Sequence, residues 1–432
     1  MSYELRPTQV QASKIMVDTL HMGKGGSFVY GSCGWGKSVL IADVASKLDK
    51  NVLVLQPSKE LLIQNYNKML SYGVDGVTQY SASVNKKDIG KITYATIGSI
   101  KDYDQFRDFG YILIDEAHCV SPKDMTGMYG KFFRAIGNPP FVGLTGTPYR
   151  LEQKFVKEKC IRNGEEEIET FYTSSVVPLN RIPNRKAESQ GLPTFIFGKM
   201  IYKIEMLELM DQKWLVTPEY DLSYAKEFDY SKLKMNTTGS NFDEKALEAF
   251  VNSPNRLKQA YQACMDSEEQ GINSNLVFCS TVTQSEKLAG LLKGQGVKAE
   301  YISAKHTPKE RKRIIDGFKG GDIKHLINYQ ILHVGFDMPH LEQVTNARPI
   351  ISPEKWVQIC GRVIRVDPAN PGKKSIIKDV AGVSRKLGRA ETIRMVKEQG
   401  GFKDEIVSEV GILSNRPLFK FRVEAEQFKK LA

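Results

Sequence analysis

The chain has 432 residues, a net charge of +11 and 41% apolar residues, enough for two or three domains with buried cores. It lacks both a signal segment and an apolar run of about 18 residues, so we expect a cytoplasmic protein without a membrane span. Its six cysteines are scattered without a C-x-x-C pair, which argues against structural zinc and a disulfide framework. The basic surplus favours a polyanion as partner.

Residues 31–38 fit the pattern G-x-x-x-x-G-K-[ST], between an apolar strand at 27–30 and a helix that opens at 39–42. Glycines there let backbone N–H groups face phosphates, and the helix N-terminus adds partial positive charge. We therefore expect a nucleotide, with Lys37 reaching the β- and γ-phosphates and Ser38 holding Mg²⁺. The other loop residues expected at the nucleotide are Gly34, Trp35 and Gly36, although the Trp35 indole fits packing better than binding.

Further apolar strands are expected at 52–55, 111–114 and 141–144. Strands that alternate with helices predict a parallel sheet covered on both faces, with the loops after the strands meeting at one edge. Asp115 and Glu116 directly follow one of these strands. An acid at a strand end can hold Mg²⁺ through water, and its neighbour can polarise the attacking water. We assign Asp115 to the metal and Glu116 to catalysis.

Residues 151–215 combine a charged stretch with prolines and a basic excess, which is typical of an insertion or linker. It could form a hairpin or an arm, and its basic residues could be solvated or contact DNA. A second α/β pattern covers 216–387, with a helix at 246–265 and strands at 275–279, 325–328 and 375–377. The first domain is thus expected at 1–150, and a basic helical extension at 388–432.

The stretch 358–365 lies in the second α/β pattern and contains Arg362 and Arg365. Two arginines three residues apart share one face if the stretch is helical. A guanidinium can stabilise the γ-phosphate in the transition state, as an arginine finger does. The alternative is an ordinary basic helix face.

Taken in order, these segments resemble the motifs of a superfamily 2 helicase of the DEAH type, from about residue 3 to 388. The matching segments are 5–9, 31–38, 56–61, 93–99, 115–118, 144–150, 277–281, 335–339 and 358–365. The resemblance implies two tandem RecA-like parallel-sheet domains, ATP in the cleft between them, and single-stranded nucleic acid across both. The segment around Gln330 and His333 departs from the family pattern.

The resemblance also assigns individual residues. Arg6 and Gln9 lie in the segment that reads adenine, and Gly335 and Asp337 lie in a nucleotide-linked segment of the second domain. Gln358 would help to place the attacking water. The residues expected to hold nucleic-acid phosphates without reading sequence are Ser58, Lys59, Thr96, Ser99 and Thr281.

Residues 143–150 and 375–382 are similar to the recombination and repair branch, which includes RecG-, RadD- and UvsW-like proteins. We therefore expect an ATP- and Mg²⁺-dependent DNA helicase or translocase. It would act as a monomer on single-stranded and branched DNA, in a prokaryotic or phage-infected cell. The alternatives are an RNA helicase, a duplex translocase that does not separate strands, and a non-catalytic nucleic-acid-binding scaffold.

Overall fold

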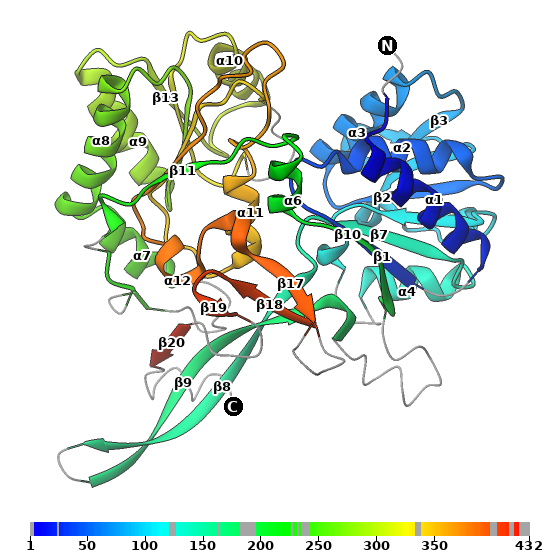
Figure 1. The fold of residues 1–432 in the computed structure, drawn as a ribbon, viewed down its shortest axis with the longest axis horizontal. Coiled ribbons are helices and arrows are strands. Elements are labelled where there is room, and N and C mark those ends of the chain that lie inside the picture. The colour runs from blue at the N-terminus through cyan, green and yellow to red at the C-terminus, as the bar shows by residue number, and fades with distance from the viewer. Residues whose placement is uncertain are drawn as a thin grey trace. The chain divides into compact units, whose positions relative to one another are not determined.

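The computed structural model describes the chain apart from residues 1–3, 24–25, 121–126, 163–164, 182–195, 226–227, 231–232, 235–241, 333–337, 398–403, 414–418 and 423–432. The chain divides into two compact units. The first comprises Met1–Arg150 and Val177–Asp211, and the second comprises Leu151–Val176 and Gln212–Ala432 (Figure 1). Within the described residues, no helix combines the length and apolar character needed to cross a membrane.

The first unit is built on an eight-stranded sheet of order β10-β1-β7-β6-β2-β5-β3-β4, parallel except for the β3-β4 pair. Its strands are β1 (Gly26–Gly31), β2 (Val52–Gln56), β3 (Val77–Ser81), β4 (Lys86–Lys87), β5 (Ile92–Thr96), β6 (Tyr111–Ile114), β7 (Phe141–Thr145) and β10 (Lys199–Ile204). Its helices are α1 (Pro7–His21), α2 (Lys37–Lys47), α3 (Lys59–Ser71), α4 (Met128–Ala135) and α6 (Met206–Asp211).

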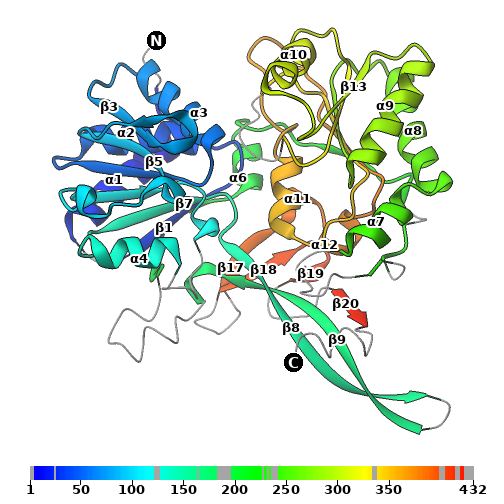
Figure 2. The same cartoon turned by 180° about the vertical axis from the view of Figure 1, so that it is seen from behind.

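Helices cover both faces of this sheet, as the sequence predicts. The crossovers through α2 and α3 run one way along the sheet, and the crossover through α4 runs back. Right-handed connections therefore place α4 on the face opposite α2 and α3 (Figure 2). Every residue of β2, β6 and β7 is buried, which explains their continuous apolar sequences.

The second unit contains a six-stranded parallel sheet of order β11-β16-β15-β12-β14-β13. The strands are β11 (Glu219–Asp221), β12 (Asn275–Phe278), β13 (Ala299–Ile302), β14 (His325–Asn328), β15 (Gln343–Asn346) and β16 (Ile376–Asp379). The helices are α7 (Glu244–Val251), α8 (Pro254–Glu269), α9 (Val282–Gly294), α10 (Pro308–Lys319), α11 (Pro353–Cys360) and α12 (Ser384–Leu387).

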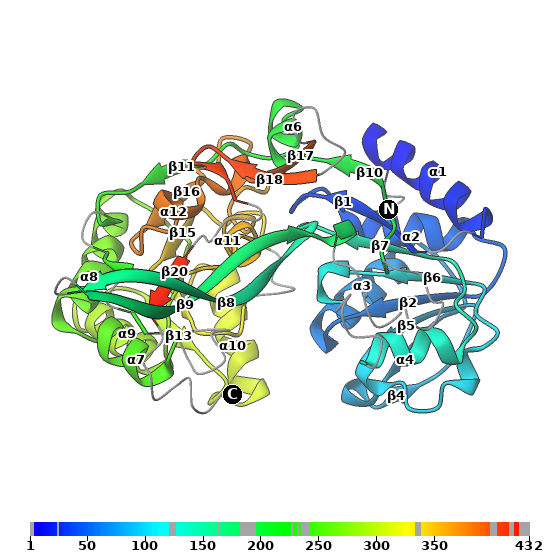
Figure 3. The same cartoon turned by 90° about the horizontal axis from the view of Figure 1, so that it is seen from below.

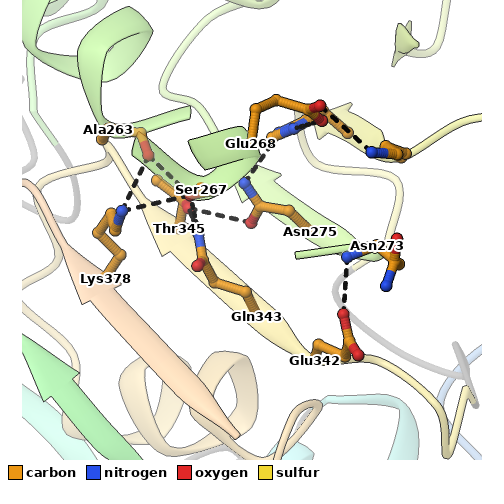
Figure 4. A network of polar contacts seen from close by, with 11 residues as sticks. Ala263, Ser267, Glu268, Asn273, Asn275, Glu342, Gln343, Thr345 and Lys378 are labelled. Carbon is orange, nitrogen blue, oxygen red and sulfur yellow. Dashed lines mark hydrogen bonds and ion pairs between the residues drawn. The ribbon is translucent and has the colours of Figure 1, made fainter. Parts of the chain in front are cut away.

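A buried polar network ties α8 to this sheet (Figure 4). Lys378 of β16 is fully buried and donates to the Ala263 carbonyl at 3.0 Å and to Ser267 Oγ at 3.2 Å. Gln343 of β15 donates to the same Ser267 hydroxyl at 2.7 Å. Because buried polar groups need partners, these contacts fix one register of α8 on the strands.

His325 of β14 extends the same network through Asn275 and Glu268. Its Nδ1 lies 3.0 Å from Asn275 Nδ2 and its Nε2 lies 2.9 Å from Glu268 Oε1. A neutral ring that accepts at Nδ1 and donates from Nε2 satisfies both contacts. Burial lowers the pKa of His325, which favours this neutral form.

Smaller sheets complete the described residues. The long strands β8 (Tyr149–Arg162) and β9 (Glu165–Pro178) form a ribbon, and β20 (Phe419–Arg422) pairs antiparallel with β9 (Figure 3). An antiparallel sheet contains β17 (Arg394–Lys397), β18 (Asp404–Ser408) and β19 (Gly411–Ile412).

Three details differ from the sequence-based expectations. The expected helix at 246–265 is two helices, α7 and α8, because Pro254 lacks the N–H that a continuous helix needs there. The described part of 388–432 forms mainly strands, so the predicted helical extension is wrong. The segment 151–215 includes the β8-β9 ribbon, but its strand β10 joins the first sheet beside β1.

Candidate nucleotide site

The phosphate-binding loop follows β1 directly and leads into α2. Gly34 and Gly36 have φ values of 86° and 93°, in the left-handed region that glycine adopts without strain. Lys37 is the first residue of α2, and its Nζ donates to the Gly31 carbonyl at 3.3 Å. Gly146, after β7, lies so close that a Cβ on it would be 3.1 Å from Lys37 Nζ. Two predicted loops thus meet at Lys37.

Gln9 of α1 contacts this loop through its side-chain amide. Its Nε2 donates to the Trp35 carbonyl at 2.7 Å, and its Oε1 accepts from Arg6 N at 2.8 Å. The structure therefore places Arg6 and Gln9 beside the loop. Among the described contacts, Gln9 Oε1 accepts this one hydrogen bond, so it can accept a second from a donor such as a base amino group. The adenine contact stays a prediction.

Trp35 has its indole inside the first unit. The residue is fully buried, its Nε1 donates to Thr8 Oγ1 at 3.0 Å, and its ring stacks on Tyr202 with centroids 5.7 Å apart. A Cβ on Gly31 would lie 2.0 Å from Trp35 Cε3. The side chain thus packs the loop, as expected. Sequence reasoning missed Tyr202, because it comes from β10, far along the chain.

Asp115 lies at the carboxyl end of β6, on the same edge as the loop. It is 4% exposed, and its carboxylate accepts from Asn65 Nδ2 at 2.8 Å and from Glu116 N at 3.0 Å. Burial and the Glu116 charge raise the pKa of Asp115 to about 6, while the Lys37 charge opposes the rise. Asn65, on α3, is a further site residue without a sequence signal of its own.

Glu116 and His118 form a second polar cluster beside Asp115. Glu116 has a φ of 48°, a conformation rare for a residue with a side chain. Its Oε2 lies 3.4 Å from His118 Nδ1. That ring nitrogen also lies 2.9 Å from Thr145 Oγ1 and 3.2 Å from Thr147 Oγ1. His118 therefore connects the Asp115–Glu116 turn to the 145–147 loop.

The oxygen atoms here suit Mg²⁺. Asp115 offers a buried carboxylate, and Ser38 a half-buried hydroxyl at the start of α2. Among the described residues, no group of three or more His, Cys, Asp or Glu side chains could hold a metal. Mg²⁺ does not need such a group, because it binds one or two protein oxygens together with substrate phosphates and water.

Gln358, Arg362 and Arg365 belong to the second unit. Gln358 lies in α11, but this helix ends at Cys360, so the expectation that both arginines share a helical face is wrong. Arg362 lies in the turn after the helix, and Arg365 forms a β-bridge with Leu215. The predicted nucleotide residues at 335 and 337 lie outside the described residues.

Two predicted nucleic-acid residues occupy equivalent places in the two units. Ser58 caps α3 and accepts from Leu61 N at 3.3 Å, and Thr281 caps α9 and accepts from Gln284 N at 3.0 Å. Where the structure describes the surroundings, neither hydroxyl proton has an acceptor. Each can therefore donate to a phosphate beside the free N–H groups of a helix N-terminus.

Thr96 and Ser99 belong to a cluster of hydroxyls after β5. Their Oγ atoms lie 2.7 Å apart, and Ser81 Oγ lies 2.8 Å from Thr96 Oγ1. Ser99 also accepts from Ala82 N at 2.9 Å. Lys59, at the start of α3, is exposed. Ser58 and Lys59 follow β2, whereas Thr96 ends β5 and Ser99 follows it, and β2 and β5 are neighbouring strands of the sheet.

Two family models match the chain. "Type III restriction enzyme, res subunit" matches residues 2–150, which include Lys37 and Asp115. "Helicase conserved C-terminal domain" matches residues 255–367, which include both arginines.

Individual relatives are distant. "Putative ATP-dependent helicase IRC3" of Saccharomyces cerevisiae is 22% identical over 381 residues, which cover 84% of this chain and 49% of that protein. "Putative helicase 22" of a Sulfolobus islandicus filamentous virus is 24% identical over 396 residues, which cover 88% of this chain and 64% of that protein. The chain thus spans between about half and two thirds of the length of these relatives.

A solved structure shares the fold. The DNA-bound Type ISP restriction-modification enzyme LlaBIII aligns with a TM-score of 0.55 at 14% identity, over 88% of this chain and 28% of that one. One family model thus covers the first sheet except β10, together with the phosphate-binding loop, and the helicase model covers most of the second parallel sheet. The chain thus carries a match to a restriction-enzyme res subunit followed by a match to a helicase C-terminal domain, the order expected from its resemblance to superfamily 2 helicases.

Proposed function

We propose that this protein is an ATP- and Mg²⁺-dependent DNA helicase or translocase that acts on forked or branched DNA in replication, recombination or repair. It would act as a monomer in the cytoplasm of a prokaryotic or phage-infected cell. One observation carries the ATPase part of the proposal. Lys37, Asp115 and Glu116 lie at the carboxyl edge of one parallel sheet, and the charges of Lys37 and Glu116 both act on the Asp115 carboxylate.

Each of these residues has a separate role in the proposed reaction. Lys37 and the backbone N–H groups at the start of α2 bind the phosphates. Ser38 and Asp115 hold Mg²⁺, which when bound neutralises phosphate charge. Glu116 orients water and takes its proton. Its contact with His118 links that carboxylate to Thr145 and Thr147, so a shift of the 145–147 loop changes the position of the base.

The second unit would supply the remaining charge. We assign Arg362 and Arg365 to the γ-phosphate, where a guanidinium stabilises the transition state, and Gln358 to the attacking water. The nucleotide assignments of Gly335 and Asp337 also remain part of this proposal.

The nucleic-acid part of the proposal rests on hydroxyls and helix N-termini. Ser58 and Thr281 each place a donor hydroxyl at the N-terminus of a helix, one in each unit. Such donors bind phosphates and carry no sequence information, so we expect sequence-independent binding. Lys59, Thr96 and Ser99 extend the first-unit part of this surface.

DNA is favoured over RNA because the family model that matches residues 2–150 describes a restriction-enzyme subunit, and the solved relative is a restriction-modification enzyme described as bound to DNA. The test is ATP turnover with single-stranded DNA and with RNA of equal length and sequence. We expect DNA to stimulate turnover more than RNA. Equal or greater stimulation by RNA would favour the RNA helicase instead.

Two variants control that measurement. Lys37→Ala and Glu116→Gln should each lower DNA-stimulated turnover by a factor on the order of 10² or more, because one removes a phosphate contact and the other the base. Retained turnover in either variant would contradict the site assignment. Wild-type turnover would at the same time exclude a non-catalytic scaffold.

A further inference from the structure

Lys373 is a buried lysine in the second unit whose ammonium group, within the described residues, binds backbone carbonyls alone. The residue is 4% exposed. Its Nζ donates to the carbonyls of Pro339 at 2.6 Å, Val363 at 2.9 Å and Arg365 at 2.5 Å. An ammonium has three N–H donors, so all of them are used. In the described part of the chain, no ion pair joins Lys373 to a carboxylate.

The three carbonyls come from two segments with proposed roles at the nucleotide. Val363 and Arg365 belong to the turn that follows α11 and carries both arginines, whereas Pro339 ends the 335–339 segment. A second bond, from Ser375 Oγ to the Val363 carbonyl at 3.2 Å, holds the same turn. Lys373 thus links the 361–365 turn to Pro339 through hydrogen bonds.

Burying the charged ammonium group of Lys373 costs free energy. A role in stability alone therefore does not explain why a lysine stands at this position. Burial and, to a smaller extent, the Arg365 charge lower the pKa of Lys373 to about 8, against the opposing charges of Asp367 and Glu342. A buried charge can often be replaced by an apolar side chain without loss of stability. An apolar side chain, however, cannot donate hydrogen bonds to three backbone carbonyls and so keep them together.

We propose that Lys373 is a positioning residue that fixes the backbone of the 361–365 turn and so sets the direction of the Arg362 and Arg365 guanidinium groups. It also makes that turn move together with the end of the 335–339 segment. The inference rests on the proposed role of these arginines in ATP hydrolysis.

Lys373→Met tests the proposal, because methionine keeps the length of the side chain and removes the three donors. We expect kcat of the DNA-stimulated ATPase to fall by roughly 10- to 100-fold. The KM for ATP should change less than about twofold, since the phosphate-binding loop belongs to the first unit and uniform binding is unaffected. An unchanged kcat would overturn the proposal.

Lys378→Met is the matched control. Lys378 is also a buried lysine of this unit, but its Nζ contacts Ala263 and Ser267 of α8 (Figure 4) and Asp221 of β11, and no hydrogen bond to the 361–365 turn is among the described contacts. Assayed below its melting temperature, this variant should keep the wild-type kcat. If it loses as much kcat as Lys373→Met does, the effect is general loss of stability and the proposal fails.

A double-mutant cycle separates this inference from the proposed function. Arg365→Ala should itself lower kcat, and adding Lys373→Met should then lower it by a smaller factor than in the wild type, because the part of the effect that acts through Arg365 is already lost and only the part through Arg362 remains. Fully additive losses would refute positioning through Arg365. If Arg365→Ala leaves kcat unchanged, the proposed role of that arginine fails, and the inference with it.

The pH profile of the wild-type protein gives a test that needs no variant to fold. Above a pH of about 8 the ammonium loses one donor, and a lone pair then faces a carbonyl. We expect kcat to fall there while the KM for ATP stays constant. A flat kcat up to a pH about two units above that value would overturn the proposal.

Discussion

At the scale of single residues, the site contains a buried carboxylate whose negative charge destabilises the folded protein. Asp115 is buried, lies beside Glu116, and has a pKa raised to about 6. The Asp115 carboxyl group therefore binds its proton more tightly in the folded protein than in the unfolded chain. Its contribution to stability is present below a pH of about 4 and is lost as the pH rises through about 6. A carboxylate kept at this cost fits a role in binding a cation.

Asp115→Asn tests this directly, because the amide stays neutral across that range. Without Mg²⁺ or nucleotide, the melting temperature of the wild type should fall relative to Asp115→Asn as the pH rises from about 4 to 7. Each kcal/mol by which the Asp115 charge lowers the free energy of unfolding should lower the melting temperature by about 2–4 °C in a domain of this size. A difference between the two melting temperatures that does not depend on pH would show that the charge carries no such penalty.

At the scale of elements, the helices that follow β2 and β12 begin in the same way. Ser58 caps α3 and Thr281 caps α9, each with an extended backbone. Thr307 caps α10 through the same kind of bond, made to Glu310 N, but no nucleic-acid role is proposed for it. A comparison of variants at Thr281 and Thr307 can therefore separate the loss of a helix cap from the loss of a nucleic-acid contact.

Thr281→Ala should weaken binding of single-stranded DNA by roughly fivefold, because it removes a hydrogen bond worth about 1 kcal/mol. The salt dependence of binding should stay the same, since no charge is lost. Fluorescence anisotropy at two salt concentrations measures both quantities. Thr307→Ala should cost about 1 kcal/mol of stability and leave the affinity unchanged. Equal losses of affinity in the two variants would contradict the role of Thr281.

The elements that were predicted correctly from the sequence share a local signal. β2, β6 and β7 are short apolar runs buried on both faces, and Gly36 with Lys37 marks the start of α2. The turn at 361–365 was predicted as helix because arginine spacing says nothing about where α11 ends. The turn after that end is held by hydrogen bonds from Lys373 and Ser375 to the Val363 carbonyl, and these two residues come later in the chain.

At the scale of the whole molecule, the order of motifs predicted two parallel sheets, and the structure contains both. The positions of β10 and Tyr202 were not predictable, because strand pairing with β1 and stacking on Trp35 depend on residues about 170 positions apart. Asn65, Tyr202 and Lys373 all act through residues that carry a motif, without belonging to one. Sequence reasoning therefore found the residues proposed for the chemistry and missed those that support them.

The most direct test of the central claim is strand displacement from a forked DNA duplex with a fluorescent label, measured with ATP and Mg²⁺. We predict displacement by the wild type, faster on the fork than on duplexes with a single 3′ or 5′ tail, and none by Lys37→Ala. Displacement of a triplex-forming strand without duplex separation would instead identify a duplex translocase. Absence of ATP-dependent displacement from every one of these DNA substrates would contradict the account.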